Sequence, residues 1–163
     1  MKRIFLIRHA KSEQGLGLKD IDRPLNDRGM RDAPKMAIRL SERNFPIDAI
    51  VSSPANRAIS TARFFAEVFS IPQKAILVQS DLYLPEPAHF YKVIKNLPEK
   101  YTSVAIFSHN NGITDFANSL DVARIDHMPT CSIFAFSAQI DSWKDFNFSQ
   151  KQFIFFDYPK SDQ

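Results

Sequence analysis

The sequence predicts an α/β protein, a three-layer α/β/α sandwich with a mainly parallel sheet and an antiparallel strand at one edge. Two observations support this fold class. Short runs of β-branched and aromatic residues alternate with segments of helical pattern. The first four runs are also almost continuously apolar, which is typical of strands buried on both faces. Alternation of this kind indicates βαβ units and a sheet covered by helices on each side.

Six strands are expected. In chain order they are the apolar runs at 4–7, 49–51, 75–78, 104–107, 133–136 and 153–156. The last two runs flank Trp143 and are expected to form an antiparallel pair at the sheet edge.

Four helices are expected between these strands, at 26–43, 54–69, 86–96 and 111–120. The first contains Pro34 in its interior, where proline removes a backbone donor. The second has the clearest start, because Ser53 is suited to cap a helix and Pro54 fits the first turn.

Length and composition indicate one soluble globular domain over residues 1–163. The chain is 44% hydrophobic and 24% charged, which is ordinary for a protein with a buried core. Its net charge is only +3, and the basic residues are scattered, so a nucleic-acid partner is not expected.

The one cysteine, Cys131, cannot form an internal disulfide, which suits a reducing compartment. No apolar run approaches the roughly 20 residues that span a bilayer. We therefore expect a cytoplasmic monomer without a membrane partner.

Polar residues directly follow three of the predicted strands. The three segments are Arg8-His9-Ala10-Lys11-Ser12, Ser52-Ser53-Pro54-Ala55-Asn56-Arg57 and Ser108-His109-Asn110-Asn111-Gly112. Ligands of open α/β sheets bind beyond the carboxyl ends of the strands. Two arginines and two histidines, namely Arg8, Arg57, His9 and His109, should therefore meet at one rim.

That combination of residues predicts a phosphate pocket. Helix N-termini and arginines both bind phosphate oxygens. One neutral imidazole, oriented through its other ring nitrogen, can attack phosphorus, while the second, protonated beside the anion, can stabilise the transferring group. Phosphoryl transfer depends mainly on positioning and electrostatic stabilisation, so neither a metal nor another cofactor is required. Lys11 and Asn110 are further candidates for phosphate contact.

These segments resemble the histidine phosphatase superfamily, also called phosphoglycerate mutase-like. Its hallmark is the tripeptide Arg8-His9-Ala10 after the first strand. Three further segments, 22–29, 52–58 with Thr61-Ala62, and 108–110, are similar to the SixA-type phosphohistidine phosphatases within that superfamily. The resemblance implies a two-step reaction in which His9 is phosphorylated and then hydrolysed, with Arg8, Arg57 and His109 completing the pocket. It also implies that the substrate is a phosphorylated histidine, for example on a histidine phosphotransfer protein in signal transduction.

The chain departs from the superfamily pattern in two places. Asn111 stands where many relatives have proline. Larger relatives carry an acidic general acid after the third strand, where this chain offers Asp81 and Glu86 as candidates. A missing acid would be tolerable for phosphohistidine, which has a good leaving group, but less so for an alkyl phosphate ester.

Two alternatives stay open at this point. The chain could be a phosphatase or mutase for small phosphate esters, or a catalytically silent phosphate-binding module on the same fold. Other phosphatase chemistries fit poorly. The residue six positions after Cys131 is Ser137, where a cysteine-based phosphatase needs arginine, and there is no P-loop.

Overall fold

The structure, a computed structural model, describes residues 1–161, so the last two residues of the predicted domain lie outside the described part. One six-stranded sheet runs in the order β3-β2-β4-β1-β5-β6. Its strands are β1 (Lys2–Arg8), β2 (Ala49–Ser52), β3 (Leu77–Val78), β4 (Ser103–Ser108), β5 (Ile133–Ala138) and β6 (Lys151–Asp157). The first four strands are mutually parallel, and β5 pairs antiparallel with both β1 and β6. The mainly parallel sheet with an antiparallel edge is confirmed.

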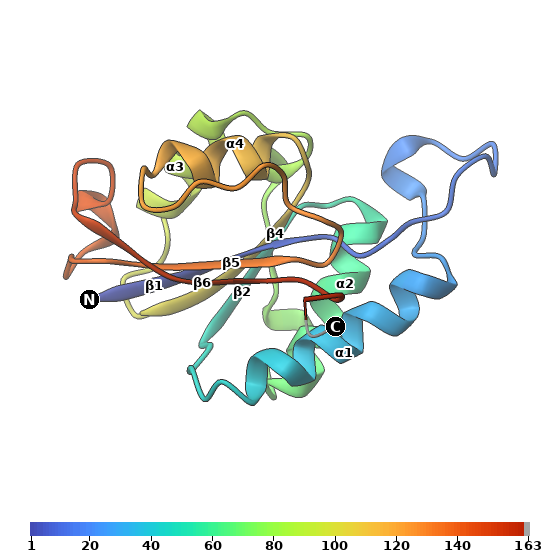
Figure 1. Cartoon of the computed structure of the whole chain (residues 1–163), viewed down its shortest axis with the longest axis horizontal. Helices are drawn as coiled ribbons and strands as arrows, with labels where there is room; N and C mark the ends of the chain where they lie inside the picture. Colours follow the sequence, from blue (N-terminus) through green and yellow to red (C-terminus); the bar gives the residue numbers. More distant parts are fainter. Residues whose placement is uncertain (162–163) are drawn as a thin grey trace.

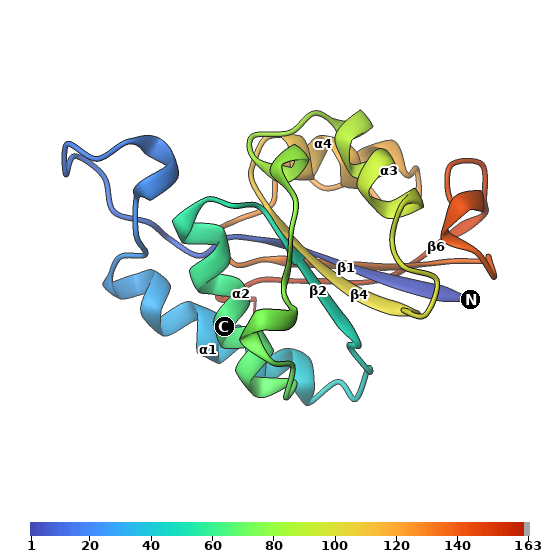
Figure 2. The same cartoon turned by 180° about the vertical axis from the view of Figure 1, so that it is seen from behind.

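Four helices cover the two faces of this sheet. They are α1 (Asp27–Ser41), α2 (Asn56–Val68), α3 (Pro87–Lys95) and α4 (Gly112–Ser119). Figures 1 and 2 show α1 and α2 on one face and α3 and α4 on the other. Each face has its own apolar cluster, because strands buried on both sides project alternate side chains into opposite layers. The predicted three-layer sandwich is confirmed.

The predicted strand at 75–78 is largely wrong. Residues 73–75 form a short 3-10 helix, and β3 keeps only Leu77 and Val78. Strand β3 is the edge strand of the sheet, with β2 as its one neighbour, and Val78 is 53% exposed. Hydrophobicity alone cannot distinguish a short edge strand from a central one, because the difference lies in which neighbours the fold supplies.

The helix starts show where local signals succeed and fail. Asn26 caps α1, accepting a 2.9 Å hydrogen bond from the Gly29 amide, and the helix continues through Pro34 as expected. The predicted cap of α2 is wrong, because this helix begins at Asn56 after Ala55, and neither provides a side-chain cap. The Ser53 hydroxyl instead contacts His109, which follows the distant strand β4.

Candidate active site

The register of the two central strands brings the histidines together. In the parallel pair β1–β4, Arg8 lies opposite Ser108, so His9 and His109 leave the sheet side by side. The His9 amide donates to the Ser108 carbonyl at 3.2 Å, and the two imidazole centroids are 5.2 Å apart. Residues 100 positions apart are thus placed together by strand pairing, as predicted.

The end of β2 contributes the third segment of the rim. The Ser53 amide donates to the Phe107 carbonyl of β4 at 3.0 Å, which places the start of α2 next to His109. Thr61 accepts a hydrogen bond from the Ala10 amide at 2.9 Å and donates to the Arg57 carbonyl at 2.8 Å. This buried threonine therefore ties the turn after β1 to the first turn of α2.

His9 is held as a neutral imidazole whose second ring nitrogen, Nε2, carries no proton. Its Nδ1–H donates to the Ala10 carbonyl at 2.7 Å, and a carbonyl can only accept. The Nε2 lone pair therefore faces the pocket, where the Arg57 Nε–H approaches it at 3.4 Å. Burial lowers the pKa of His9 to about 3, with the positive charges of Arg57, Arg8 and Arg23 contributing to the shift. Such an imidazole is a nucleophile at neutral pH.

His109 faces the same pocket in a complementary way. Its Nε2 lies 2.7 Å from the Ser53 hydroxyl, and Nδ1 is buried with no hydrogen-bond partner among the described residues. When Ser53 donates to Nε2, the ring carries its proton on Nδ1, which can then donate to an anion. Burial lowers the pKa of His109 to about 3, and the nearby His9 and Arg57 add to this shift. His109 is thus neutral until an anion enters and favours its charged form.

Two arginines line the cavity beside these rings. Arg8 donates to the Met128 carbonyl at 2.8 Å, and its buried Nε has no hydrogen-bond partner within the described chain. Burial, together with the charge of Arg57, lowers the pKa of Arg8, although a guanidinium stays protonated in any ordinary buffer. Arg57 is 2% exposed and is held by Asp20, whose backbone carbonyl accepts from Nη1 at 2.7 Å and whose carboxylate accepts from Nη2 at 3.0 Å.

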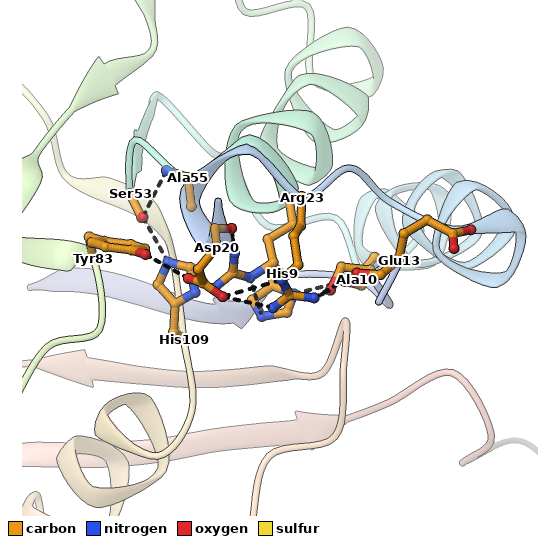
Figure 3. Close-up of polar contacts among 11 residues, drawn as sticks. His9, Ala10, Glu13, Asp20, Arg23, Ser53, Ala55, Tyr83 and His109 are labelled. Atoms are coloured by element: carbon orange, nitrogen blue, oxygen red, sulfur yellow. Dashed lines mark hydrogen bonds and ion pairs between the residues drawn. The ribbon is translucent and has the colours of Figure 1, made fainter. Parts of the chain in front are cut away.

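Asp20 lies in the short 3-10 helix η1 (Asp20–Asp22) and joins three segments of the chain. Its carboxylate accepts hydrogen bonds from Tyr83 at 2.6 Å, from Arg57 and from Arg23 at 3.1 Å. These hydrogen bonds, of which the one from Tyr83 has the largest effect, hold the pKa of Asp20 well below its usual range. Figure 3 shows Asp20 between His109 and His9, with Tyr83 on one side.

These side chains enclose a cavity of about 240 Å³, large enough for a phosphoryl group and part of its leaving group. The described residues that line it are Arg8, His9, Lys11, Ser12, Gln14, Asp20, Arg23, Arg57, Leu84, His109, Asn110 and Thr130. All six of the predicted pocket residues, including Lys11 and Asn110, are among them. The cavity therefore brings together groups from every strand end that the sequence singled out.

The two general-acid candidates are not in this cavity. Asp81 forms an ion pair with Lys92 at 3.3 Å on the surface of the α3 side. Glu86 is the N-terminal cap of α3 and forms a capping box with His89. Both carboxylates have structural partners, so the suggestion that either protonates a leaving group is not supported.

Three residues at the cavity were not identified from the sequence as functional. The sequence predicts Ser53 as a helix cap, and no motif in the sequence singles out Asp20 or Tyr83. Asp20 and Tyr83 are 63 positions apart, and no spacing rule connects them. Only the three-residue offset between Asp20 and Arg23 could have signalled the ion pair that they form at 3.1 Å.

The cavity is suited to an anion rather than a metal. Within residues 1–161, no cluster of three or more His, Cys, Asp or Glu side chains is arranged to hold a metal ion.

None of the helices in that same range is long and apolar enough to cross a membrane.

Solved structures of similar fold cover nearly the whole chain. The protein histidine phosphatase SixA in complex with tungstate superimposes with a TM-score of 0.83 at 20% identity, covering 99% of both chains. A candidate phosphohistidine phosphatase SixA from Agrobacterium tumefaciens gives 0.80 at 23% identity, covering 97% of this chain and 99% of that one. Mycobacterial glucosyl-3-phosphoglycerate phosphatase gives 0.70 at 15% identity, covering 94% and 97%. These likenesses establish the fold.

Sequence comparison adds a family match over the N-terminal part of the chain. An uncharacterized chloroplastic protein of Arabidopsis thaliana is 29% identical over 164 residues, covering 88% of this chain and 70% of that protein. The family model of the histidine phosphatase superfamily (branch 1) matches residues 4–80, which contain Arg8, His9 and Arg57. The matched part of the chain is therefore similar to the histidine phosphatase superfamily, and the enzyme class that this similarity indicates is a phosphatase hydrolase.

Proposed function

We propose that this phosphatase removes phosphate from a phosphorylated histidine of a partner protein, through a transient phosphohistidine on His9. The observation that supports the reaction is the hydrogen bond from His9 Nδ1 to the Ala10 carbonyl, which leaves Nε2 as the attacking atom in an arginine-lined cavity. The SixA-like fold supports the substrate class.

The first step forms a bond between His9 Nε2 and phosphorus, while the bond to the substrate's imidazole nitrogen breaks and its electron pair leaves with that ring. Arg8, Arg57 and the Nδ1–H of His109 stabilise the charge on the phosphoryl oxygens. In the second step water attacks phosphorus, the electron pair of the P–N bond returns to His9 Nε2, and phosphate leaves with the protons of water.

The lack of an acid near the nucleophile favours phosphohistidine over an ester. The one carboxylic acid among the described lining residues, Asp20, is ionised and cannot donate a proton. An alkoxide leaving group needs that proton, whereas an imidazole already protonated on its other nitrogen does not.

The test is phosphate release, without added metal, from a histidine-phosphorylated phosphotransfer protein and from an aryl phosphate. We expect release from phosphohistidine, and a loss of roughly 10³-fold or more in His9→Ala, because the nucleophile is gone. His127→Ala, which changes an exposed histidine that does not line the cavity, is the matched control and should keep full activity.

The other outcomes identify the alternatives. Turnover of the aryl phosphate alone would indicate a small-ester phosphatase. Binding of phosphate without any turnover would indicate a silent binding module. The metal independence, the cytoplasmic location and the monomeric state predicted from the sequence stay predictions.

A further inference from the structure

The nucleophile and the carboxylate of the cavity lie at different depths. His9 and His109 are 7% and 1% exposed, whereas the Asp20 side chain is 46% exposed. The nucleophile is therefore at the floor of the cavity and Asp20 is at its mouth. In an in-line transfer the leaving group departs on the side opposite the nucleophile. The leaving group must therefore point toward the mouth, where Asp20 lies.

Asp20 is an anion in a cavity otherwise built for anions. Its carboxylate is fixed by donors from three segments: Tyr83 and Arg57 donate to one oxygen, and Arg23 donates to the other through Nε and Nη2. The other titratable groups that line the cavity are Arg8, His9, Lys11 and His109. Both terminal nitrogens of Arg57 donate to Asp20, while its Nε faces His9. Asp20 therefore binds the outer edge of the Arg57 guanidinium, and the Nε edge near the nucleophile faces the phosphate site.

We propose that Asp20 determines which leaving group this cavity accepts: its carboxylate, fixed at the mouth, accepts the N–H of a protonated imidazole leaving group and repels leaving groups that carry negative charge. This inference rests on the proposed function and names a residue that gives it selectivity. Asp20 transfers no proton in this role, because an ionised carboxylate only accepts hydrogen bonds.

The chemistry of phosphohistidine explains why such a contact helps. When the P–N bond breaks, its electron pair stays on the leaving nitrogen. If the other ring nitrogen carries a proton, the ring leaves as neutral imidazole, and otherwise it leaves as the far less stable imidazolate anion. A carboxylate that accepts this N–H favours the protonated form, and a charge-assisted hydrogen bond is stronger than a neutral one. An aryl phosphate has no such proton and releases a phenolate, which Asp20 repels.

The experiment compares phosphoimidazole with an aryl phosphate, since these two small substrates differ in their leaving group. We expect Asp20→Asn to lower the kcat for phosphoimidazole about tenfold and to leave the aryl phosphate rate unchanged or raised. The alkaline limb of the kcat profile for phosphoimidazole should also move down by about one pH unit, because the bound imidazole loses its proton more easily. Tyr83→Phe keeps the charge of Asp20 but removes one of its hydrogen bonds. It should change the ratio of the phosphoimidazole rate to the aryl phosphate rate in the same direction as Asp20→Asn, but by less.

Asp22→Asn is the matched control, because Asp22 belongs to the same η1 turn, is exposed and does not line the cavity. It should leave both rates and the pH profile unchanged. If Asp20 only holds Arg57 in place, Asp20→Asn should lower the rates for both substrates equally and leave the alkaline limb of the pH profile unmoved. That result would overturn the inference. Failure of the wild type to release phosphate from phosphohistidine would instead refute the proposed function.

Discussion

At the scale of single residues, one backbone carbonyl determines the chemistry of the nucleophile. The Ala10 carbonyl accepts from His9 Nδ1, which fixes the tautomer and orients the ring. The Ser53 hydroxyl orients the His109 ring in the same way, because its oxygen lies 2.7 Å from Nε2. Both partners are small groups in turns of segments that the sequence singles out, but the hydrogen bonds that they form to the histidines are not recognisable from the sequence.

The buried histidines predict a pH dependence of stability. Both have a pKa of about 3 in the folded state and near 6.5 when unfolded. Between these values the unfolded chain binds more protons, so the stability they contribute is fully present above pH 6.5 and is lost as the pH falls toward 3. Each can contribute a slope of up to about 1.4 kcal/mol per pH unit.

Urea unfolding of the wild type at pH 7 and pH 5 measures this slope. The double variant His9→Asn/His109→Asn, which removes both titrating groups, should lose less stability over the same interval. Equal losses in the two proteins would contradict the lowered pKa values.

At the scale of elements, helix α4 begins in close contact with the loop that precedes α3. A Cβ added at Gly112 would lie 2.0 Å from the Pro85 carbonyl oxygen, so this contact requires glycine. The neighbouring Leu84 lines the cavity, and His109 lies just before α4, with its carbonyl accepting from the Ile113 amide at 2.9 Å. The packing of α4 against this loop therefore supports two walls of the site.

Gly112→Ala should accordingly lower both stability and activity. Overpacking of this kind costs about 1–3 kcal/mol, and the backbone must shift at Pro85 or at His109. Chemical denaturation would report the lost stability, and steady-state kinetics a raised KM. A variant with the wild-type unfolding midpoint and KM would show that the loop yields without cost.

At the scale of the whole molecule, the sheet and both helical layers meet around an electropositive cavity. Arg8, Arg23, Arg57 and Lys11 line it, with Asp20 as the counter-charge. An oxyanion that binds only the folded state stabilises the whole chain by mass action, by about 2.7 kcal/mol at 100 times its Kd.

Phosphate or tungstate should therefore raise the Tm by roughly 5–10 °C at that concentration, given the size of the chain. Thermal unfolding with increasing oxyanion measures the effect, and chloride at equal ionic strength controls for salt. Arg57→Ala should abolish most of the rise. A rise that persists in this variant would place the bound anion elsewhere.

The sequence by itself determined the layer architecture and the position of the site. Apolar runs that alternate with helical segments require a covered, mainly parallel sheet, and such a sheet brings its carboxyl ends to one rim. For that reason the sequence alone predicts that Arg8, His9, Arg57 and His109 lie together.

Tertiary structure alone decided the finer features. Strand β3 lies at the edge because of its neighbours, Ser53 bonds His109 rather than capping α2, and Asp81 pairs with Lys92 away from the cavity. Asp20 and Tyr83 meet across 63 residues. Each of these depends on which distant group supplies a hydrogen-bond or charge partner, and local propensity contains no information about groups that only folding brings near.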